Sequence, residues 1–459
     1  MKIIVAGTGF VGLTHAAVCS EYGHEVYAYD IDQKRLAAYR SADHEQISHY
    51  VSEPGLSNII AENINRYLFF VDDLAPILEG VDAIFLCLPT PPHREGSSDL
   101  SLYFNALDHI AALLAKREDQ RRVVLINKST VPIGTARRLE QMLEKHNVPN
   151  AGVASNPEFL PEGNAVEKSR HPDRVVVGGD TEDDFRIMRR IYSQFYNHVR
   201  IGYLETTPET AEAIKYVANT LLLTYISFWN GVGARLGEAM PNVRMEDLKR
   251  GVTADNRIST WGSYVSNGAG GSCFGKDVQS LIYQLKTAGH KTDLLQSVYG
   301  INEYQKTYLI ERAINEAGAR FNNKTVALLG LAFKQRTNDM RDSSALQVVE
   351  ALLGRGVREI RAYDPLATSE AKRFMNPENN HLFERITYHD SPKAALEGSD
   401  MLFISTDWEE FRGLSSTIEN TVKAPYLIMD GRRMIPDYNE LVQRGYGYLA
   451  VGSPYMKPE

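Results

Sequence analysis

The chain has 459 residues, and typical domain sizes predict roughly two to four domains for that length. Apolar residues make up 43% and charged residues 24%, a composition typical of soluble globular proteins. The net charge of −8 excludes a broad positive surface for nucleic acid. The N-terminal apolar run is too short for a signal peptide, and no stretch reaches the ~20 apolar residues of a membrane span. We therefore expect a cytoplasmic protein without a membrane anchor.

Three cysteines are spread along the chain at Cys19, Cys87 and Cys273. An odd count with this spacing favours neither a disulfide framework nor a metal site. We expect three thiols in a reducing compartment and no bound metal, and most such thiols are small buried apolar groups.

Residues 1–200 alternate short apolar strands with helical stretches, which is typical of a parallel, doubly wound sheet. The strands are expected at residues 2–6, 25–29, 83–88, 123–127 and 175–178.

A long amphipathic pattern over residues 208–238 predicts a helix of about 45 Å. This helix would join two domains and present a dimer surface. Beyond it, a strand with a glycine turn at 325–330, a helix through 347–353 and a strand at 359–363 ending in Asp364 repeat the order found at the N-terminus. The sequence therefore predicts an α/β protein with two Rossmann-like doubly wound domains joined by a long central helix. The expected domains are residues 1–200, 201–314 and 315–459.

The first strand leads into the glycines Gly7, Gly9 and Gly12, and the second strand ends at Asp30. This context makes the glycine pattern a strong dinucleotide signal. Gly7 would form the tight turn, Gly9 would admit the pyrophosphate, and Gly12 would let helix and strand pack closely. Asp30 would accept hydrogen bonds from the adenosine ribose and repel a 2′-phosphate, which favours NAD. The alternative is a purely structural turn followed by a solvated strand end.

The segment GGSCFGKD at 270–277 carries the most chemical information. Two glycines allow close backbone approach before Cys273, and Lys276 can favour its thiolate. Asp277 follows one helical turn later, on the same face. A reactive thiol is favoured over the alternative, a structural cysteine, because its neighbours are polar and charged.

At this point the chain resembles the UDP-glucose/GDP-mannose dehydrogenases, and most closely the UDP-glucose 6-dehydrogenases, over nearly its whole length. Besides the glycine turn, the shared motifs are KSTVP (128–132), SNPEFLPEG (155–163), EAIKYVAN (212–219), NRI (256–258), GGSCFGKD (270–277), GLAFK (330–334), RDSS (341–344) and DGR (430–432).

The resemblance implies two hydride transfers from the sugar C6 to two successive NAD molecules. UDP-glucose, two NAD and water would give UDP-glucuronate and two NADH. Cys273 would attack the intermediate aldehyde, and a second oxidation would convert the thiohemiacetal into a thioester that water cleaves.

The resemblance also implies catalytic partners for Cys273. Lys215 and Asn219, one helical turn apart, look like oxyanion stabilisers. Thr130 and Asp277 resemble the pair that holds a water molecule, and Glu158 resembles the acid–base carboxylate of the hydrolysis step. The alternatives are an ordinary solvated helix face for the first pair and a surface loop carboxylate for Glu158 or Glu162.

The binding residues are implied in the same way. For NAD they are Gly7, Gly9, Phe10, Val11, Gly12, Asp30, Lys34, Pro89, Thr90, Thr130, Glu162, Lys276 and Arg341. For the sugar nucleotide they are Glu158, Phe159, Leu160, Glu162, Lys215, Asn219, Arg257, Gly270, Cys273, Phe333, Lys334 and Arg432. The residue like Arg257 comes from the neighbouring subunit in the family, which implies a homodimer.

The chain departs from the family pattern in the loop at 259–269 and at Gly275, where many relatives have proline. Because this loop faces the sugar-nucleotide pocket in the family, GDP-mannose or another nucleotide hexose stays open as the substrate. The residues beside Cys273 disfavour the UDP-N-acetylhexosamine branch, which typically has histidine there. Two further alternatives are a two-electron dehydrogenase and a non-catalytic protein that binds NAD and a UDP-sugar.

Overall fold

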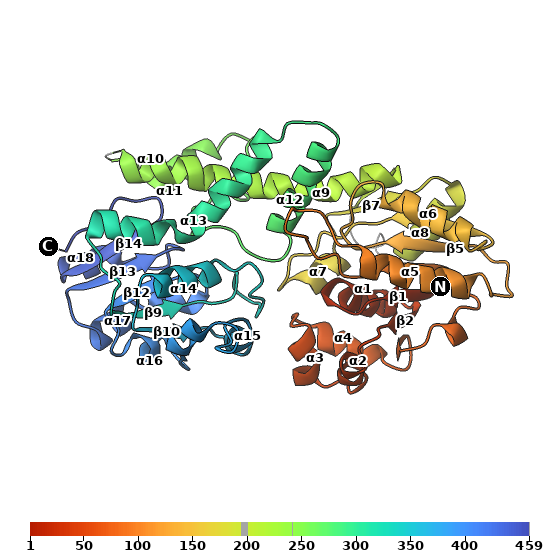
Figure 1. Cartoon of the computed structure of the whole chain (residues 1–459), viewed down its shortest axis with the longest axis horizontal. Coiled ribbons are helices and arrows are strands. Elements are labelled where there is room, and N and C mark those ends of the chain that lie inside the picture. Colours follow the sequence, from red (N-terminus) through yellow and green to blue (C-terminus); the bar gives the residue numbers. More distant parts are fainter. Residues whose placement is uncertain (194–200, 241, 459) are drawn as a thin grey trace. The chain divides into compact units, whose positions relative to one another are not determined.

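The computed structural model describes residues 1–193, 201–240 and 242–458 (Figure 1). The chain forms two compact units. Unit 1 comprises residues 1–218 and 283–288, and unit 2 comprises residues 219–282 and 289–459.

Unit 1 is built on an eight-stranded sheet with the strand order β3-β2-β1-β4-β5-β6-β7-β8. The strands are β1 (Lys2–Ala6), β2 (Glu25–Tyr29), β3 (Leu68–Val71), β4 (Ala83–Leu86), β5 (Val123–Asn127), β6 (Ala151–Ser155), β7 (Arg174–Gly178) and β8 (Gly202–Thr206). The predicted parallel sheet is confirmed from β3 through β6. The observed sheet differs from the prediction at β7. This strand pairs with β6 in the antiparallel direction, through Ser155 and Gly178. The connection there holds the six-residue helix α7 instead of a full crossover helix.

Helices cover both faces of this sheet (Figure 1). Ile3 and Val5 of β1 belong to one buried core, whereas Ile4 and Ala6 belong to a second core on the opposite face. A strand that is buried on both faces has the continuous apolar sequence of a doubly wound fold. The helices are α1 (Phe10–Glu21), α2 (Gln33–Arg40), α3 (His44–Tyr50), α4 (Leu56–Asn63), η1 (Ala75–Ile77), α5 (Ser101–Leu114), α6 (Thr135–Lys145), α7 (Ala165–Arg170) and α8 (Glu182–Tyr192).

The long central helix is confirmed as three consecutive helical segments. These are α9 (Pro208–Phe228), a π-helical turn (Trp229–Gly233) and α10 (Ala234–Ala239). Gly233 lies against the Trp229 ring, which a Cβ would approach to 2.7 Å, so glycine at this position makes room for the indole. The division between the two units falls within α9.

Unit 2 contains a six-stranded parallel sheet with the order β11-β10-β9-β12-β13-β14, as predicted for a second Rossmann-like domain. Its strands are β9 (Thr325–Leu329), β10 (Glu359–Tyr363), β11 (Ile386–Tyr388), β12 (Met401–Ile404), β13 (Tyr426–Asp430) and β14 (Tyr446–Ala450). The remaining helices are α11 (Met245–Val252), α12 (Phe274–Thr287), α13 (Asp293–Ala317), α14 (Ser344–Gly354), α15 (Thr368–Phe374), η4 (His381–Arg385), α16 (Pro392–Leu396), η5 (Glu409–Gly413), α17 (Ser415–Thr421) and α18 (Tyr438–Gln443).

The glycine turn and terminal aspartate recur in unit 2, but the aspartate has a different role. Gly330 has φ +89° after β9, and Asp364 follows β10. One carboxylate oxygen of Asp364 accepts the backbone N–H groups of Leu331 and Ala332 and the indole N–H of Trp408. Asp364 is 3% exposed and therefore braces the turn from inside.

Candidate functional site

The glycine turn after β1 combines two structural glycines with one that packing does not require. Gly7 has φ +93°, and a Cβ there would lie 2.4 Å from the Cys87 carbonyl oxygen. A Cβ on Gly12 would lie 1.9 Å from the Gly7 carbonyl oxygen. A Cβ on Gly9 would meet nothing within 4 Å, although Gly9 directly precedes α1 at Phe10. The open space at this helix N-terminus fits the close approach of a pyrophosphate.

Asp30 lies at the end of β2, where the ribose-binding carboxylate is expected. Its Oδ2 atom accepts hydrogen bonds from the Thr8 N–H (2.8 Å) and the Thr8 hydroxyl (2.7 Å), and forms an ion pair with Arg35 at 3.1 Å. Burial alone would raise the pKa of Asp30, but the bonds from Thr8 and Asp32 and the charge of Arg35 hold it below its usual range. The predicted Lys34 has an exposed side chain. Arg35 was not among the residues predicted from the sequence. Its place directly after Lys34 in α2 was the signal that could have indicated it.

The other NAD residues expected on turns follow β4 and β5, two neighbouring strands of the sheet. The Thr90 hydroxyl, after β4, donates to the Thr130 carbonyl oxygen at 3.0 Å, after β5. Ser129 donates to the Leu88 carbonyl oxygen at 2.7 Å. The structure therefore brings Pro89, Thr90 and Thr130 together at the carboxyl edge of the sheet, where doubly wound folds bind ligands.

A buried ion pair occupies the loop after β6. Lys215 of α9 donates to Glu158 Oε1 at 2.8 Å, and the Leu160 N–H donates to Oε2 at 2.6 Å. The Lys215 ammonium also lies 5.6 Å from the centre of the Phe159 ring. Burial would raise the pKa of Glu158, but Lys215, the Leu160 N–H and Lys128 together lower it. Glu158 is therefore a charged carboxylate, and the solvated-surface alternatives for Glu158 and Lys215 do not hold. Glu162, on the same loop, is partly exposed.

The predicted nucleophile lies at the N-terminus of α12 in unit 2. The Asp277 N–H donates to the Cys273 carbonyl oxygen at 2.9 Å, so the two residues share one helical turn as expected. The Cys273 side chain is exposed, and a helix N-terminus favours a thiolate. Asp277, 1% exposed, accepts bonds from Asn219 at 2.6 Å and Lys276 at 2.7 Å. Asn219 thus faces Asp277, and neither residue belongs to a solvated helix face.

The glycine pair before Cys273 packs against the segments that follow β9. The Gly271 N–H donates to the Arg341 carbonyl oxygen at 3.0 Å, and its φ of +90° suits only glycine. A Cβ on Gly271 would lie 3.0 Å from the Phe333 ring, and one on Gly270 would lie 2.5 Å from the Asp342 carbonyl oxygen. The segment carrying Cys273 is therefore fixed against Phe333 and the 341–342 turn.

Basic residues of unit 2 gather at the carboxyl edge of its sheet. Arg432, after β13, donates to the Ser405 carbonyl oxygen at 2.7 Å and to the Phe333 carbonyl oxygen at 3.4 Å. The Lys334 ammonium lies 5.3 Å from the centre of the Phe333 ring. Phe333, Lys334 and Arg432 thus form one cluster, which suits a diphosphate bound at the strand ends.

Two predicted arginines are held by local carboxylates. Arg341 pairs with Asp339 at 2.7 Å, and Arg257 pairs with Asp255 at 2.5 Å. The Arg257 side chain is 84% exposed, and within the described part of the chain its hydrogen bonds go to Asp255. Its expected role across a subunit interface stays a prediction.

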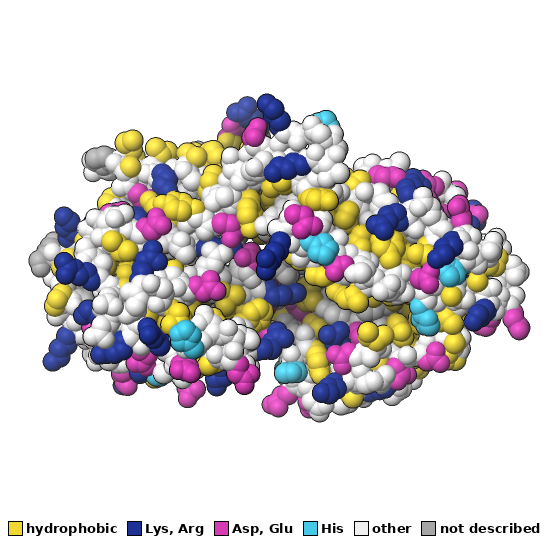
Figure 2. Space-filling model, viewed as in Figure 1, with side chains coloured by type: hydrophobic (Ala, Val, Ile, Leu, Met, Phe, Trp, Pro, Cys, Tyr) yellow, Lys and Arg dark blue, Asp and Glu magenta, His cyan; other side chains and the backbone are white. Residues whose placement is uncertain are grey.

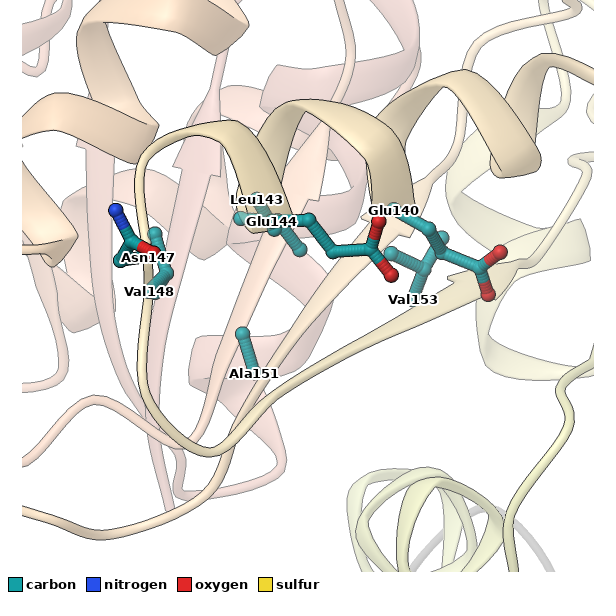
Figure 3. Close-up of a pocket in the computed structure, with 7 residues that line it drawn as sticks. All are labelled: Glu140, Leu143, Glu144, Asn147, Val148, Ala151 and Val153. Atoms are coloured by element: carbon teal, nitrogen blue, oxygen red, sulfur yellow. The ribbon is translucent and has the colours of Figure 1, made fainter.

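A surface hollow of unit 1 lies between α6 and β6 (Figure 3). Its lining includes Glu140, Glu144 and Ala151, and Ala151 is the first residue of β6. The hollow therefore opens beside the amino end of β6, whereas the predicted NAD residues follow the carboxyl ends of the strands.

Among the described residues, no group of three His, Cys, Asp or Glu side chains could hold a metal ion. The same residues contain no helix that is long and apolar enough to span a membrane.

Gly9 and Gly12 provide a matched pair of substitutions. We expect Gly9→Ala to fold normally but to weaken NAD binding about tenfold or more, because the added methyl group occupies the space for the pyrophosphate. Gly12→Ala is expected to lose thermal stability, because its Cβ overlaps the Gly7 carbonyl oxygen. Melting curves and NAD titrations separate the two effects. Unchanged NAD affinity in Gly9→Ala would contradict the assignment.

The three cysteines should differ sharply in reactivity. Burial raises the pKa of the Cys19 and Cys87 thiols to about 12, so both are protonated at pH 8. Only a thiolate reacts rapidly with iodoacetamide. Peptide mass mapping of the native protein after brief treatment at pH 8 should find label on Cys273 alone. Equal labelling of Cys87 would contradict the buried environment of that thiol.

The chain matches all three domains of one family. Residues 1–196 match the NAD binding domain of the UDP-glucose/GDP-mannose dehydrogenase family, residues 209–304 its central domain and residues 327–437 its UDP binding domain. The predicted NAD cofactor and UDP-sugar ligand are confirmed at this level.

Relatives of nearly equal length support the match. The chain is 37% identical to the UDP-glucose 6-dehydrogenase of Pseudomonas aeruginosa, covering 99% of this chain and 98% of that protein. It is 34% identical to the UDP-glucose 6-dehydrogenase of Rhizobium meliloti, covering 99% and 100%. A solved UDP-glucose dehydrogenase from Pyrobaculum islandicum has a TM-score of 0.85 at 29% identity, covering 97% of this chain and 96% of that one. The chain therefore belongs to the UDP-glucose/GDP-mannose dehydrogenase family.

Proposed function

We propose that the protein oxidises UDP-glucose at C6 to UDP-glucuronate, using two NAD and one water molecule. The observation that carries this proposal is the exposed Cys273 at the start of α12, one turn before the buried Asp277. A dehydrogenase that stops at the aldehyde needs no nucleophile. The names of the two curated relatives support UDP-glucose as the substrate.

NAD supplies the hydride acceptor for both oxidation steps. Gly9 leaves room for its pyrophosphate at the start of α1, and Asp30 accepts hydrogen bonds from the adenosine ribose while repelling a 2′-phosphate. Arg35 belongs with the expected residues because its ion pair orients the Asp30 carboxylate. The remaining NAD contacts are proposed at Gly7, Phe10, Val11, Gly12, Lys34, Pro89, Thr90, Thr130, Glu162, Lys276 and Arg341.

Cys273 carries the sugar between the two oxidations. After the first hydride and a proton leave the C6 alcohol, the Cys273 thiolate adds to the aldehyde carbon and forms a thiohemiacetal. Loss of a second hydride and the hydroxyl proton leaves a thioester. Water then adds to the thioester carbonyl, Glu158 takes one proton from that water, and the Cys273 thiolate departs from the new carboxylic acid, which releases its proton to solvent.

Lys215 and Asn219 are proposed to stabilise the oxyanion, since they lie one turn apart on α9. In the structure Lys215 donates to Glu158 and Asn219 donates to Asp277, so both side chains are held in defined positions on this helix. Asp277 and Thr130 are proposed to hold the water molecule. Asp277 suits this role as a buried carboxylate oriented by two donors.

The sugar nucleotide is proposed to bind at the Phe333, Lys334 and Arg432 cluster, whose two cations suit a diphosphate. Further proposed contacts are Glu158, Phe159, Leu160, Glu162, Lys215, Asn219, Arg257, Gly270 and Cys273. The domain division at residues 1–200, 201–314 and 315–459 is proposed with it, supported by the ranges of the three family matches. A cytoplasmic location completes this proposal.

Product stoichiometry tests the reaction. With limiting UDP-glucose, the wild-type protein should form two NADH and one UDP-glucuronate per sugar. Cys273→Ala should form no UDP-glucuronate, because no thioester can form. One NADH per sugar with an active Cys273→Ala would contradict the proposal in favour of a two-electron dehydrogenase.

Parallel assays with GDP-mannose test the substrate. Activity with GDP-mannose but not with UDP-glucose would show that the substrate of the same reaction is GDP-mannose. Binding of NAD and UDP-glucose without NADH would indicate a non-catalytic protein.

A homodimer is proposed from the exposed surface of α9 and α10. Leu221, Phe228, Val232 and Leu236 recur at helical spacing, and each is between 38% and 55% exposed. Apolar side chains gather over α10 (Figure 2). Sedimentation velocity should give a dimer for the wild-type protein and a monomer for Leu221→Glu/Phe228→Glu. A wild-type monomer at micromolar concentration would refute the assembly.

A further inference from the structure

Lys128, in the KSTVP motif after β5, is a buried cation to which the reaction above gives no role. It is 7% exposed. Its ammonium donates to Asn156 Oδ1 at 2.9 Å and to the Tyr192 hydroxyl at 3.4 Å. Both partners are neutral, and no ion pair of Lys128 occurs among the described residues. An ammonium buried beside neutral groups is costly, which indicates a role for its charge.

The bond from Lys128 to Asn156 holds the start of the loop that carries Glu158. Asn156 makes three further bonds. Its N–H donates to the Asn127 carbonyl oxygen at 2.8 Å, its amide donates to the Val176 carbonyl oxygen at 2.8 Å, and its Oδ1 accepts from the Tyr192 hydroxyl at 2.5 Å. Glu158 follows two residues later. Lys128 therefore restrains the loop from the β5 side, while Lys215 holds the Glu158 carboxylate from α9.

Lys128 and Glu158 also line the same small cavity of about 50 Å³ within unit 1. A cavity of this size, lined by both polar and apolar side chains, admits a few water molecules, too few to screen the charges as bulk water does. The Lys128 charge therefore acts on the carboxylate across this space. Lys128 is one of the groups that lower the pKa of Glu158, after Lys215 and the Leu160 N–H.

Apart from Lys215, the titratable groups buried around these two residues are neutral near pH 7, whereas those at the outer part of the cavity are charged. Burial and the Lys128 charge lower the pKa of His15 well below its usual value, which keeps the imidazole uncharged. Burial raises the pKa of the Cys19 and Cys87 thiols to about 12. At the outer part of the cavity lining, Lys168 and Asp173 pair with each other at 2.9 Å. Arg174, also in the lining, stacks on Phe159 at 3.7 Å.

We propose that Lys128 is a positioning residue that holds the Asn156–Glu158 loop and, together with Lys215, keeps the Glu158 carboxylate ionised for thioester hydrolysis. This inference rests on the proposed function. In that step Glu158 takes one proton from the attacking water, the water oxygen bonds to the acyl carbon, and the carbon–sulfur bond breaks to release the Cys273 thiolate. Glu158 must be unprotonated when the step begins.

A second cation is needed because Lys215 has two tasks. While Lys215 donates to the oxyanion, its attraction to Glu158 is shared with another negative charge. Burial lowers the pKa of Lys128, and the negative charge of Glu158 opposes that shift. The bond from Lys128 to Asn156 does not involve the substrate, so Lys128 stays beside the carboxylate in every step. Its contribution should therefore be greatest in the hydrolysis step.

Hydrolysis is measured by single turnover. Enzyme is mixed with UDP-glucose and excess NAD, quenched with acid, and the acyl adduct on Cys273 is followed by whole-protein mass spectrometry between pH 5 and pH 9. Acylated Cys273 no longer titrates, so the pH dependence of adduct decay reports the ionisation of the proposed base, Glu158. Lys128→Met removes a positive charge and should raise the pKa of Glu158, moving the acid limb of decay toward neutral pH. The ratio of decay rates at pH 5.5 and pH 8 should fall at least about threefold.

Three variants serve as comparisons. Lys128→Arg keeps the charge and should restore the wild-type acid limb. Tyr192→Phe removes one hydrogen-bond partner but leaves the charge, so its acid limb should also match the wild type. Asn156→Asp places a negative charge against Lys128 and should shift the limb in the same direction as Lys128→Met. It provides a second test if Lys128→Met does not fold, as judged by its melting curve and NAD affinity.

An unchanged acid limb in both folded Lys128→Met and Asn156→Asp would overturn the role of Lys128 while leaving the proposed function intact. Absence of UDP-glucuronate formation by the wild-type enzyme would overturn both. A slower decay with the same pH dependence would reduce Lys128 to a structural residue and likewise contradict the inference.

Discussion

The buried ion pair between Lys215 and Glu158 is the contact on which the catalytic arrangement of unit 1 depends. Burying two opposite charges carries a desolvation cost, and such a pair persists when further hydrogen bonds satisfy the remaining polar atoms. The Leu160 N–H provides one of these bonds. The pair joins α9 to the loop between β6 and β7, whose start is also held by bonds from Asn156 to Asn127 and from Lys128 to Asn156. Glu158 therefore keeps a defined position although it lies outside any regular element.

In unit 2 the same helix, α9, also holds a buried carboxylate. One turn after Lys215, Asn219 of α9 donates to Asp277, which also receives the Lys276 ammonium. Each of the two proposed catalytic carboxylates is thus held by a side chain of α9. The helix serves both units, which explains why its sequence carries polar residues at positions that are buried rather than solvated. Cys273, at the start of α12, is fixed relative to Asp277 by a helical hydrogen bond.

The two Rossmann-like sheets differ in how each uses its glycine turn. In unit 1, Gly9 leaves open space at the start of α1, and Asp30 is oriented by Thr8 and Arg35. In unit 2, the Asp364 carboxylate accepts hydrogen bonds from two backbone N–H groups and the Trp408 indole. The second turn is held by its own aspartate, and the ligand site of unit 2 is proposed instead at the basic cluster of Lys334 and Arg432. The family matches assign NAD to the first domain and UDP to the other, in agreement with this difference.

The sequence predicted the strands around both glycine turns closely, because fully buried parallel strands have continuous apolar runs that end at glycine or aspartate. It did not predict the antiparallel contact at β7, since strand direction depends on a connection that has little apolar pattern. Arg35 was missed because a charged residue on an exposed helix resembles any other until its partner is known. The pairing of Lys215 with Glu158 brings together distant segments, which no local spacing reveals.

The most direct test of the central claim is the mass of the Cys273→Ser protein after incubation with UDP-glucose and NAD. An oxygen ester is cleaved more slowly than a thioester, so the covalent intermediate should persist on the serine. The proposed covalent mechanism predicts a UDP-glucuronyl adduct on the peptide containing residue 273. This adduct should be absent when NAD is omitted. UDP-glucuronate formation at the wild-type rate without any adduct at this position would contradict it.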